Sequence, residues 1–374
     1  MQKIQMASPY FSNNDKEEIH KELDQILDHK LSMGPNVKKF EENFAKRLSV
    51  NHAIGMNTCT STLEAALSYY NVKNKEVIIP TQTFIATGMA VYHSGAKPVF
   101  AEISKENLSI DFEDIKKKVN SKTAGIIVVH MAGYISDDIF KIKKFCDENS
   151  LFLIEDSAHA PGSKINNHEA GTIGHIGCFS FYPTKVITSG EGGMLVTNCN
   201  DISMFARSYQ NRGADISLNY ELYINPSRNV RMTEFSALLG RIQLKHLDKF
   251  LSKRRNIGLT YKKILENSDY LKLILPDNME QTTCWKVPII LDNRFDRNYV
   301  LDQLQKNNIF ADKAYDPPLH LQPVMKKIFK SYEGLLPASE AILSKNICLP
   351  SHQGMTIDDV KYVCKKLIQI LKSL

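Results

Sequence analysis

The sequence lacks several patterns by which whole classes of protein are recognised. Its seven cysteines form no CxxC pair and are irregularly spaced, so neither a zinc site nor a disulfide framework is indicated. No apolar run reaches the roughly 18 residues that span a bilayer. The first residues also lack the basic and apolar regions of a signal peptide. We therefore expect a cytoplasmic protein that has no metal site and no membrane contact.

Charge of one sign is not concentrated anywhere along the chain. The 374 residues carry a net charge of +6, but lysine and arginine are spread out and form no tail suited to nucleic acid. Hydrophobic residues make up 43% of the chain and charged residues 24%, which is typical of a globular protein with a core. These numbers exclude a disordered chain and give no reason to expect a nucleic-acid partner.

What is present is an alternation of helices and short apolar strands. Two amphipathic helices are expected first, near residues 13–27 and 37–48. Strands are then expected at 77–80, 98–100, 125–129, 151–154, 178–182 and 194–197, and helices at 61–70, 84–93, 112–120 and 137–148. Strands that are apolar throughout fit a sheet covered on both faces, which predicts a parallel-rich α/β domain. The last two strands lie too close together for a crossover helix, so the sheet should be mixed.

The pattern changes towards the C-terminus. One long helix is expected from Thr233 to about Leu251, and beyond it the helical period weakens. Shorter elements follow: a strand near 285–291 and helices at 297–306 and 357–373. We therefore place a domain boundary near residue 250, with a large domain at 1–250 and a smaller one at 251–374.

Two polar residues at strand ends are candidates for chemistry. Asp156 follows the strand at 151–154, and ligands of open α/β sheets collect at the carboxyl ends of strands. Its carboxylate could hold a cationic ring nitrogen, a metal ion or a ribose hydroxyl, or simply cap the next segment. Lys185 stands between a strand and the Gly-rich turn at 190–193. In a cleft lined by aromatic residues its pKa would be lowered, making the amine a nucleophile towards a carbonyl; otherwise it is a surface lysine.

A third candidate is the segment at 57–61, which reads Asn-Thr-Cys-Thr-Ser and opens a helix. Helix N-termini bind phosphate through free N–H groups and the helix dipole. Simple capping by Thr60 or Ser61 is the plainer interpretation, and it does not conflict with phosphate binding.

Taken together and in order, six segments resemble the DegT/StrS family of sugar aminotransferases. They are Gly34-Pro35 with Phe40-Glu41, residues 80–87, Glu155-Asp156 with Ala158-His159, residues 180–185 with 190–193, residues 229–234, and residues 317–320 with 349–350. The resemblance covers most of the chain. It implies the α/β fold type I of enzymes that depend on pyridoxal phosphate (PLP): a large domain with a mixed, mostly parallel sheet between helices, plus a smaller C-terminal α+β domain.

The resemblance also implies a role for each motif. Lys185 would be the Schiff-base lysine and, once freed by the substrate amine, the base that moves a proton between Cα and C4′. Asp156 would pair with the pyridinium nitrogen, and His159 would hydrogen-bond the ring hydroxyl, although many relatives have Gln there. Phe84 would stack on the ring, Thr58, Cys59, Thr60 and Ser180 would hold the phosphate, and Asn229 would reach it from the neighbouring subunit of a homodimer.

The chain departs from the family pattern in two places. Thr58-Cys59 stands where Ser-Gly or Ser-Ala is more usual, and Asn211-Arg212-Gly213 stands where Asn-His-Gly is common. The loop at 211–213 is expected near the substrate. By position alone, the candidates for substrate binding are Arg231, Lys313 and His320.

The implied reaction passes an amino group from an amino acid, with L-glutamate the expected donor, to a keto sugar through pyridoxamine phosphate. The expected acceptor is a nucleotide-linked keto-deoxyhexose, in amino-sugar or surface-polysaccharide biosynthesis. Alternatives are a free keto sugar or aminocyclitol as acceptor, a PLP-dependent sugar dehydratase, and a non-catalytic regulatory homologue. Lys185 argues against the dehydratases, which carry His there, and the complete set of Asp156, His159 and Lys185 argues against the regulator. A Rossmann oxidoreductase is disfavoured because no GxGxxG follows a strand.

Overall fold

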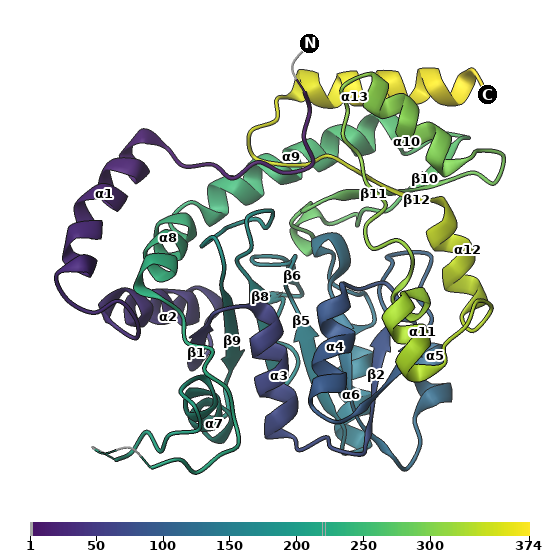
Figure 1. The fold of residues 1–374 in the computed structure, drawn as a ribbon. Coiled ribbons are helices and arrows are strands. Elements are labelled where there is room, and N and C mark those ends of the chain that lie inside the picture. The colour runs from purple at the N-terminus through teal and green to yellow at the C-terminus, as the bar shows by residue number, and fades with distance from the viewer. Residues whose placement is uncertain (1–2, 219, 221) are drawn as a thin grey trace.

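The main sheet accounts for the alternation of helices and apolar strands. In the computed structural model, which describes residues 3–218, 220 and 222–374, seven strands form this sheet (Figure 1). Their order is β1 (His52–Met56), β9 (Gly193–Thr197), β8 (Ile176–Ser180), β5 (Phe152–Asp156), β4 (Thr123–Val129), β2 (Glu76–Pro80) and β3 (Lys97–Ala101). Neighbouring strands from β8 to β3 are parallel, whereas β9 is antiparallel to both β8 and β1. The predicted mixed, mostly parallel sheet is confirmed.

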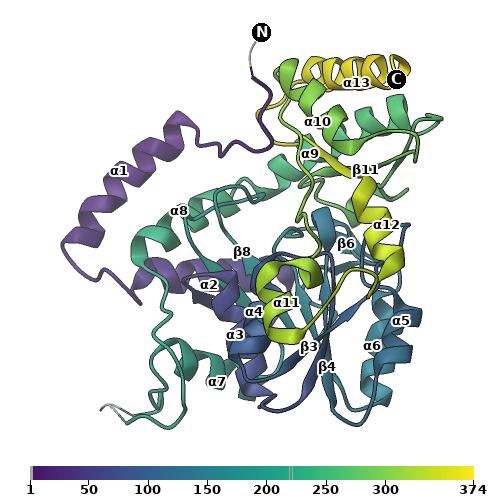
Figure 2. The same cartoon turned by 45° about the vertical axis from the view of Figure 1, so that its right-hand side comes forward.

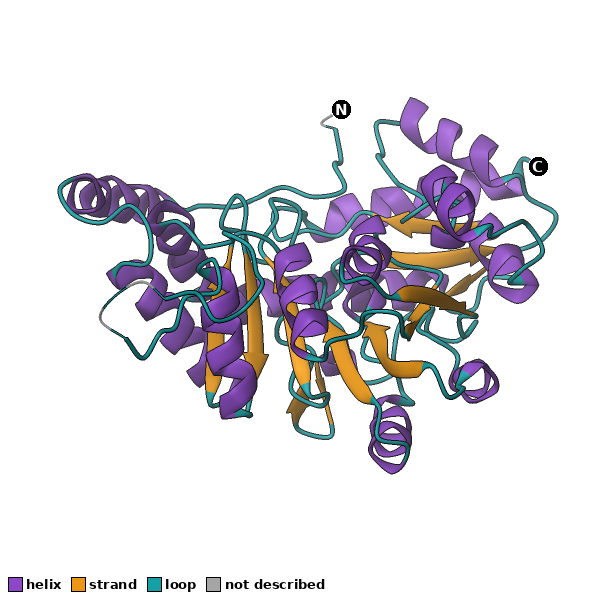
Figure 3. Ribbon diagram, turned by 60° about the horizontal axis from the view of Figure 1, so that its bottom comes forward, coloured by secondary structure: helices purple, strands orange, loops and turns teal. Residues whose placement is uncertain are grey.

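Helices cover both faces of this sheet (Figure 3). One face carries α3 (Cys59–Tyr69), α4 (Ile85–His93) and α7 (Asn200–Gln210), and the opposite face carries α2 (Pro35–Leu48), α5 (Phe112–Lys118), α6 (Ile139–Glu148) and α8 (Glu234–Leu244). On β5, for example, Ile154 packs under the first group and Leu153 under the second. Successive side chains of a strand point to opposite faces, so strands that are apolar at every position need two layers of helices.

The C-terminal part of the chain forms a second, smaller sheet with its own core. Its strands are antiparallel in the order β10 (Leu271–Leu273), β11 (Val287–Leu291) and β12 (Asn346–Leu349). Around them pack α9 (Leu247–Leu265), α10 (Arg297–Lys306) and α13 (Ile357–Lys372). This unit lies above the main sheet in the view of Figure 1. The predicted smaller C-terminal α+β unit is thus present.

The remaining elements surround these two sheets. Helix α1 (Asn13–Leu27) contacts α8 and lies on the side away from α13 (Figure 2). The others are α11 (Pro323–Phe329), α12 (Pro337–Lys345), the hairpin of β6 (Lys164–Ile165) and β7 (His168–Glu169), and the 3-10 turns η1 (Met131–Gly133), η2 (Met279–Gln281) and η3 (Leu319–Leu321).

The prediction of one helix over 233–251 is wrong, because the structure has two helices there. Helix α8 ends at Leu244 and α9 begins at Leu247. At the junction, the N–H groups of Lys245 and His246 bond to carbonyl groups three residues back, not four. Such bonds tighten the turn and interrupt the α-helical ladder. The apolar period continues through the break, which is why the sequence pattern does not reveal it.

Helix α9 connects the two cores. Leu251 packs in the core beneath α2, whereas Tyr261 packs in the core of the small sheet. A boundary near residue 250 would fall inside this helix, and the division into 1–250 and 251–374 stays a prediction. Within the described residues, no helix combines the length and apolar character needed to cross a membrane. In the same part of the chain, no group of three or more His, Cys, Asp or Glu side chains is arranged to hold a metal ion.

A buried carboxylate ties the start of α2 to the start of α8. Glu234 is fully buried and accepts hydrogen bonds from the N–H groups of Gly34 at 2.9 Å, Asn36 at 2.7 Å and Val37 at 2.9 Å. Helix starts leave such N–H groups without intrahelical partners, and Gly34 at the N-cap has no side chain to satisfy them. The glutamate that ends the motif at 229–234 therefore has a structural role.

We predict that Glu234→Ala lowers the free energy of unfolding by about 2–3 kcal/mol, because three N–H groups lose their acceptor. Glu148→Ala is the matched control, since Glu148 is exposed and faces only Lys144, at 3.7 Å. Exposed pairs of this kind contribute less than about 1 kcal/mol. Urea unfolding followed by circular dichroism measures both variants. Equal losses in the two would contradict the role given to Glu234.

Candidate active site

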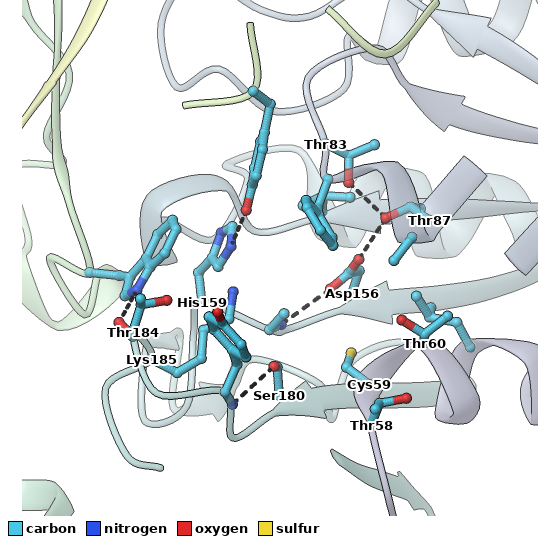
Figure 4. A pocket seen from close by; sticks show the side chains of 18 of the residues that line it. Thr58, Cys59, Thr60, Thr83, Thr87, Asp156, His159, Ser180, Thr184 and Lys185 are labelled. Carbon is cyan, nitrogen blue, oxygen red and sulfur yellow. Dashed lines mark hydrogen bonds between the residues drawn. The ribbon is translucent and has the colours of Figure 1, made fainter. Parts of the chain in front are cut away.

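A cavity of about 520 Å³ lies at the carboxyl ends of β5 and β8, where open α/β sheets collect ligands. Residues just before β11 and around the starts of α3 and α4 also line it. The structure brings together here eight of the residues expected to hold the cofactor: Thr58, Cys59, Thr60, Phe84, Asp156, His159, Ser180 and Lys185. In Figure 4, Asp156, His159 and Lys185 surround one space, with Thr58, Cys59 and Thr60 to the right.

Lys185 is positioned by the turn that follows β8. Its N–H donates to the carbonyl oxygen of Tyr182 at 2.9 Å, and its Nζ lies 4.6 Å from the centre of the Trp285 ring. The side chain faces the cavity and has protein around it. Burial lowers the pKa of Lys185 to about 8, even though the nearby Asp156 acts in the opposite direction. The sequence-based expectation of an amine with a lowered pKa thus agrees with the surroundings of Lys185.

Asp156 ends β5 with its carboxylate turned into the cavity. The hydroxyl of Thr87 donates to Oδ2 at 2.9 Å, and the N–H of Ala158 donates to Oδ1 at 3.2 Å. Thr83, which precedes α4, in turn contacts the Thr87 hydroxyl at 2.7 Å, so the first turn of α4 and the segment before it hold the carboxylate through two threonines (Figure 4). Burial nevertheless raises the pKa of Asp156 above its ordinary value. A cationic partner in the cavity would offset this cost, as a pyridinium nitrogen does.

His159 is held by two aromatic side chains. Its ring stacks on Trp285, with 3.8 Å between centroids and 9° between planes, and its Nε2 lies 2.9 Å from the Tyr315 hydroxyl. Burial, together with the charge of Lys185, keeps the pKa of His159 well below its ordinary value, so the ring is neutral at pH 7. Its Nδ1 is buried without a hydrogen-bond partner among the described residues. If Tyr315 donates to Nε2, Nδ1 carries the proton and can donate to a ligand.

The start of α3 offers free backbone N–H groups. The Thr58 side chain caps the helix by accepting from the N–H of Ser61 at 3.1 Å. Among the described residues, the N–H groups of Cys59 and Thr60 have no acceptor, which leaves them for an anion. Gly193 passes so close that a Cβ there would lie 2.4 Å from the Thr58 carbonyl carbon. The glycine lets β9 approach this helix start.

Several lining residues were missed by the sequence analysis: Met6, Ala7, Trp285, Lys286, Asp312 and Tyr315. They come from irregular segments, where no hydrophobic period marks a position. Tyr315 and its neighbour Ala314 both adopt left-handed backbone conformations, with φ of 69° and 38°. Such conformations are rare for these residue types and tend to occur at functional sites. The sequence contains no signal for them.

Four expected site residues do not line this cavity. Asn229 is exposed, and Arg231 donates to the Asn211 side chain at 3.2 Å. Lys313 pairs with Asp316 at 3.2 Å. His320 is fully buried, hydrogen-bonded to other parts of the chain. Roles for these residues in binding stay predictions, since none of the four lines the cavity that contains Lys185.

Comparisons with known proteins match this chain to a family of aminotransferases. A model described as the DegT/DnrJ/EryC1/StrS aminotransferase family matches residues 13–368. GDP-perosamine synthase of Vibrio cholerae is 34% identical over 336 residues, covering 89% of this chain and 90% of that protein. A putative pyridoxal phosphate-dependent aminotransferase of Bacillus subtilis, EpsN, is 29% identical over 377 residues, covering 98% of this chain and 96% of that protein. Among solved structures, Helicobacter pylori PseC, an aminotransferase involved in the biosynthesis of pseudoaminic acid, has a TM-score of 0.92 at 26% identity and covers 100% of both chains.

The lowered pKa of Lys185 predicts how its reactivity depends on pH. The free amine should increase as pH rises through about 8 in the folded, cofactor-free protein. In the urea-unfolded chain the midpoint should return to about 10.4, the ordinary lysine value. Acetylation of Lys185 by limiting acetic anhydride, quantified by peptide mass spectrometry at a series of pH values, measures both midpoints. The same midpoint in both states would contradict a desolvated amine.

Proposed function

The chain belongs to the DegT/DnrJ/EryC1/StrS aminotransferase family of PLP-dependent sugar aminotransferases, and from this premise we propose that it aminates a nucleotide-linked keto-deoxyhexose with L-glutamate as donor. In the net exchange, the donor Cα gives up a hydrogen and its amino group, and the ketone carbon of the sugar gains an amino group and a hydrogen. One water supplies the oxygen of the resulting keto acid, and the ketone oxygen of the sugar leaves as another water. The exchange is balanced and needs no external oxidant. The product would be an amino sugar for a surface polysaccharide or a related glycan.

The observation that carries this proposal is the placement of Lys185. Its amine faces the cavity with a pKa lowered to about 8, so a useful fraction is unprotonated near neutral pH and can attack a carbonyl. Lysine at this position also disfavours a sugar dehydratase, which would carry His. A purely regulatory homologue would have no need of this amine beside Asp156 and His159.

The residues around the cavity fit PLP on several counts. Asp156 offers a desolvated carboxylate to the ring nitrogen, and the unpartnered Nδ1 of His159 is a donor for the ring oxygen. The N–H groups of Cys59 and Thr60 suit the phosphate, and Phe84, which is 55% exposed in this chain, suits the ring face. When bound, PLP supplies an electron sink for the negative charge that develops at the donor Cα.

The chain's own side chains supply the proton transfers. Lys185 would bond covalently to the cofactor and, once released, its amine would carry a proton between the donor Cα and C4′ of the cofactor. Asp156 would remain ionised against the ring nitrogen. His159, neutral at pH 7, would donate from Nδ1 without adding a second positive charge next to Lys185.

Similarity to enzymes of nucleotide-sugar metabolism supports the choice of acceptor. The Vibrio cholerae relative is named for the synthesis of a GDP-linked amino sugar. A nucleotide diphosphate would favour basic residues at the mouth of the cavity, and Arg231 and Lys313 stay candidates for that contact. A free keto sugar or an aminocyclitol is the alternative acceptor within the same chemistry.

A homodimer would complete the site. Asn229 is exposed and outside the cavity of its own chain, as expected if it reaches the phosphate of a neighbouring subunit. Leu222 and Ile224, on the same loop, are 46% and 54% exposed, and Phe84 is also exposed. Apolar side chains that are exposed to this extent support a contact between subunits at the surface formed by Leu222, Ile224 and Phe84. Location in the cytoplasm stays a prediction alongside the dimer.

We predict that the protein loaded with PLP absorbs visible light and loses this band when L-glutamate is added. Lys185→Ala should lower turnover by about 10³-fold or more, because both the nucleophile and the proton carrier are lost. Lys141→Ala is the control, since the Lys141 side chain is 69% exposed, pairs with Asp138 and lies outside the cavity lining. Full turnover by Lys185→Ala would refute the assignment.

The acceptor is identified in the second half of the same experiment. Keto-sugar nucleotides, free keto sugars and keto-cyclitols are supplied after the glutamate step, and the aminated product is identified by NMR. The proposal expects the highest kcat/KM with a nucleotide-linked keto-deoxyhexose. A higher kcat/KM with a free keto sugar or cyclitol would replace the acceptor proposed here.

A further inference from the structure

The cavity contains a second cation besides Lys185. Among the described residues that line it, Lys185 and Lys286 carry ammonium groups, and none is an arginine. Arg231 and Lys313 lie outside this lining. In the proposed function Lys185 is occupied by its covalent bond to the cofactor. Lys286 is then the ammonium group left in the cavity to meet an anionic substrate.

Lys286 is held in place from two sides. It directly precedes β11, its ammonium group pairs with the carboxylate of Asp312, and its Nζ lies 4.5 Å from the centre of the Trp285 ring. Asp312 is itself fixed, because its Oδ1 accepts the N–H of Ala314 at 3.0 Å. An ordered lysine loses less conformational entropy when a ligand binds than a free surface lysine does.

The ammonium group of Lys286 retains donors for a ligand. A lysine ammonium group has three N–H donors, and the contact with Asp312 uses one of them. The Lys286 side chain is only 12% exposed, so its attraction for a carboxylate is less screened than at the surface. Asp312 is 39% exposed, so water weakens the repulsion that it would exert on a second carboxylate.

Lys286 and the reacting amine of Lys185 share a neighbour, the Trp285 indole. Lys185 and Lys286 approach the same indole, at 4.6 and 4.5 Å from its centre. Burial lowers the pKa of Lys185, and the charge of Lys286 adds to this lowering. In an α-amino acid the carboxylate is bonded to the carbon that carries the amine. A donor whose nitrogen takes the place of Lys185 therefore presents its α-carboxylate to the cavity that Lys286 also lines.

We propose that Lys286, held by Asp312 and Trp285, binds the α-carboxylate of the amino-acid donor. The inference rests on the proposed function and deepens it by naming the residue that recognises the donor. Recognition of the donor therefore comes from the segment before β11.

Single-turnover titration of the PLP-loaded protein with L-glutamate tests this proposal. Lys286→Met removes the charge but keeps much of the side-chain length. We expect the glutamate concentration for half-maximal loss of the visible band to rise about tenfold or more, and Lys286→Arg to recover part of the loss. Lys272→Met is the matched control, because Lys272 lies on the same small sheet and pairs with Glu106 outside the cavity.

Trp285 gives a second readout that does not depend on turnover. It is the one tryptophan in the sequence, so the intrinsic indole fluorescence reports on this contact. Titration with 2-oxoglutarate should change this fluorescence in the wild-type protein, and Lys286→Met should need about tenfold more ligand for the same change. A far-UV circular dichroism spectrum equal to that of the wild-type protein establishes that the variant is folded.

The outcomes separate this inference from the function on which it rests. If glutamate leaves the visible band of the wild-type protein intact, the proposed function fails and the inference fails with it. If the wild-type protein reacts and Lys286→Met has the same half-maximal concentration, only the inference is overturned. A rise confined to the KM of the keto-sugar acceptor would assign Lys286 to the acceptor and also overturn it.

Discussion

The arrangement of the cavity depends on the contacts that the indole of Trp285 makes with the residues around it. It stacks on His159 at 3.8 Å, and its Nε1 donates to the carbonyl oxygen of Thr184 at 2.7 Å. The ammonium groups of Lys185 and Lys286 lie over the same ring. Through this one side chain, the segment before β11 contacts residues at the carboxyl ends of β5 and β8. A shift of the indole would therefore disturb the proposed nucleophile and its neighbouring histidine together.

The backbone around Trp285 is fixed by polar contacts. The guanidinium of Arg254 is fully buried and donates to the carbonyl oxygens of Trp285 at 3.4 Å and Ser351 at 2.6 Å. Burial lowers the pKa of Arg254 to about 10, which still leaves it charged at neutral pH. The hydroxyl of Thr283 donates a hydrogen bond to the carbonyl oxygen of His159 at 2.7 Å. This contact needs glycine at position 133, because a Cβ there would lie 1.9 Å from the Thr283 hydroxyl oxygen. These contacts make the cavity largely pre-organised, as a site for covalent chemistry requires.

The sequence predicts the main sheet and the centre of the site because both follow local rules. Apolar runs mark β5 and β8, and polar residues that follow such runs are candidates for the carboxyl edge of the sheet, as Asp156 and Lys185 are. For Lys185 the strand alone leaves a surface position open, and the resemblance to the family is what favours the site. Trp285 and Tyr315 belong to irregular segments, and their approach to His159 depends on how the small sheet packs against the large one. His320 follows a recognisable motif, yet it links Thr81 at 2.5 Å to Glu340 at 3.0 Å inside the protein. A motif gives the order of residues, but the burial of a side chain depends on distant segments.

The central claim is that Lys185 forms the covalent bond to the cofactor. Reduction of the PLP-loaded protein with sodium borohydride makes that bond permanent, and peptide mass spectrometry then identifies the modified lysine. The account predicts modification of the peptide that contains Lys185 and none of the peptide that contains Lys286. Modification of Lys286 or of a surface lysine, with Lys185 left free, would contradict it.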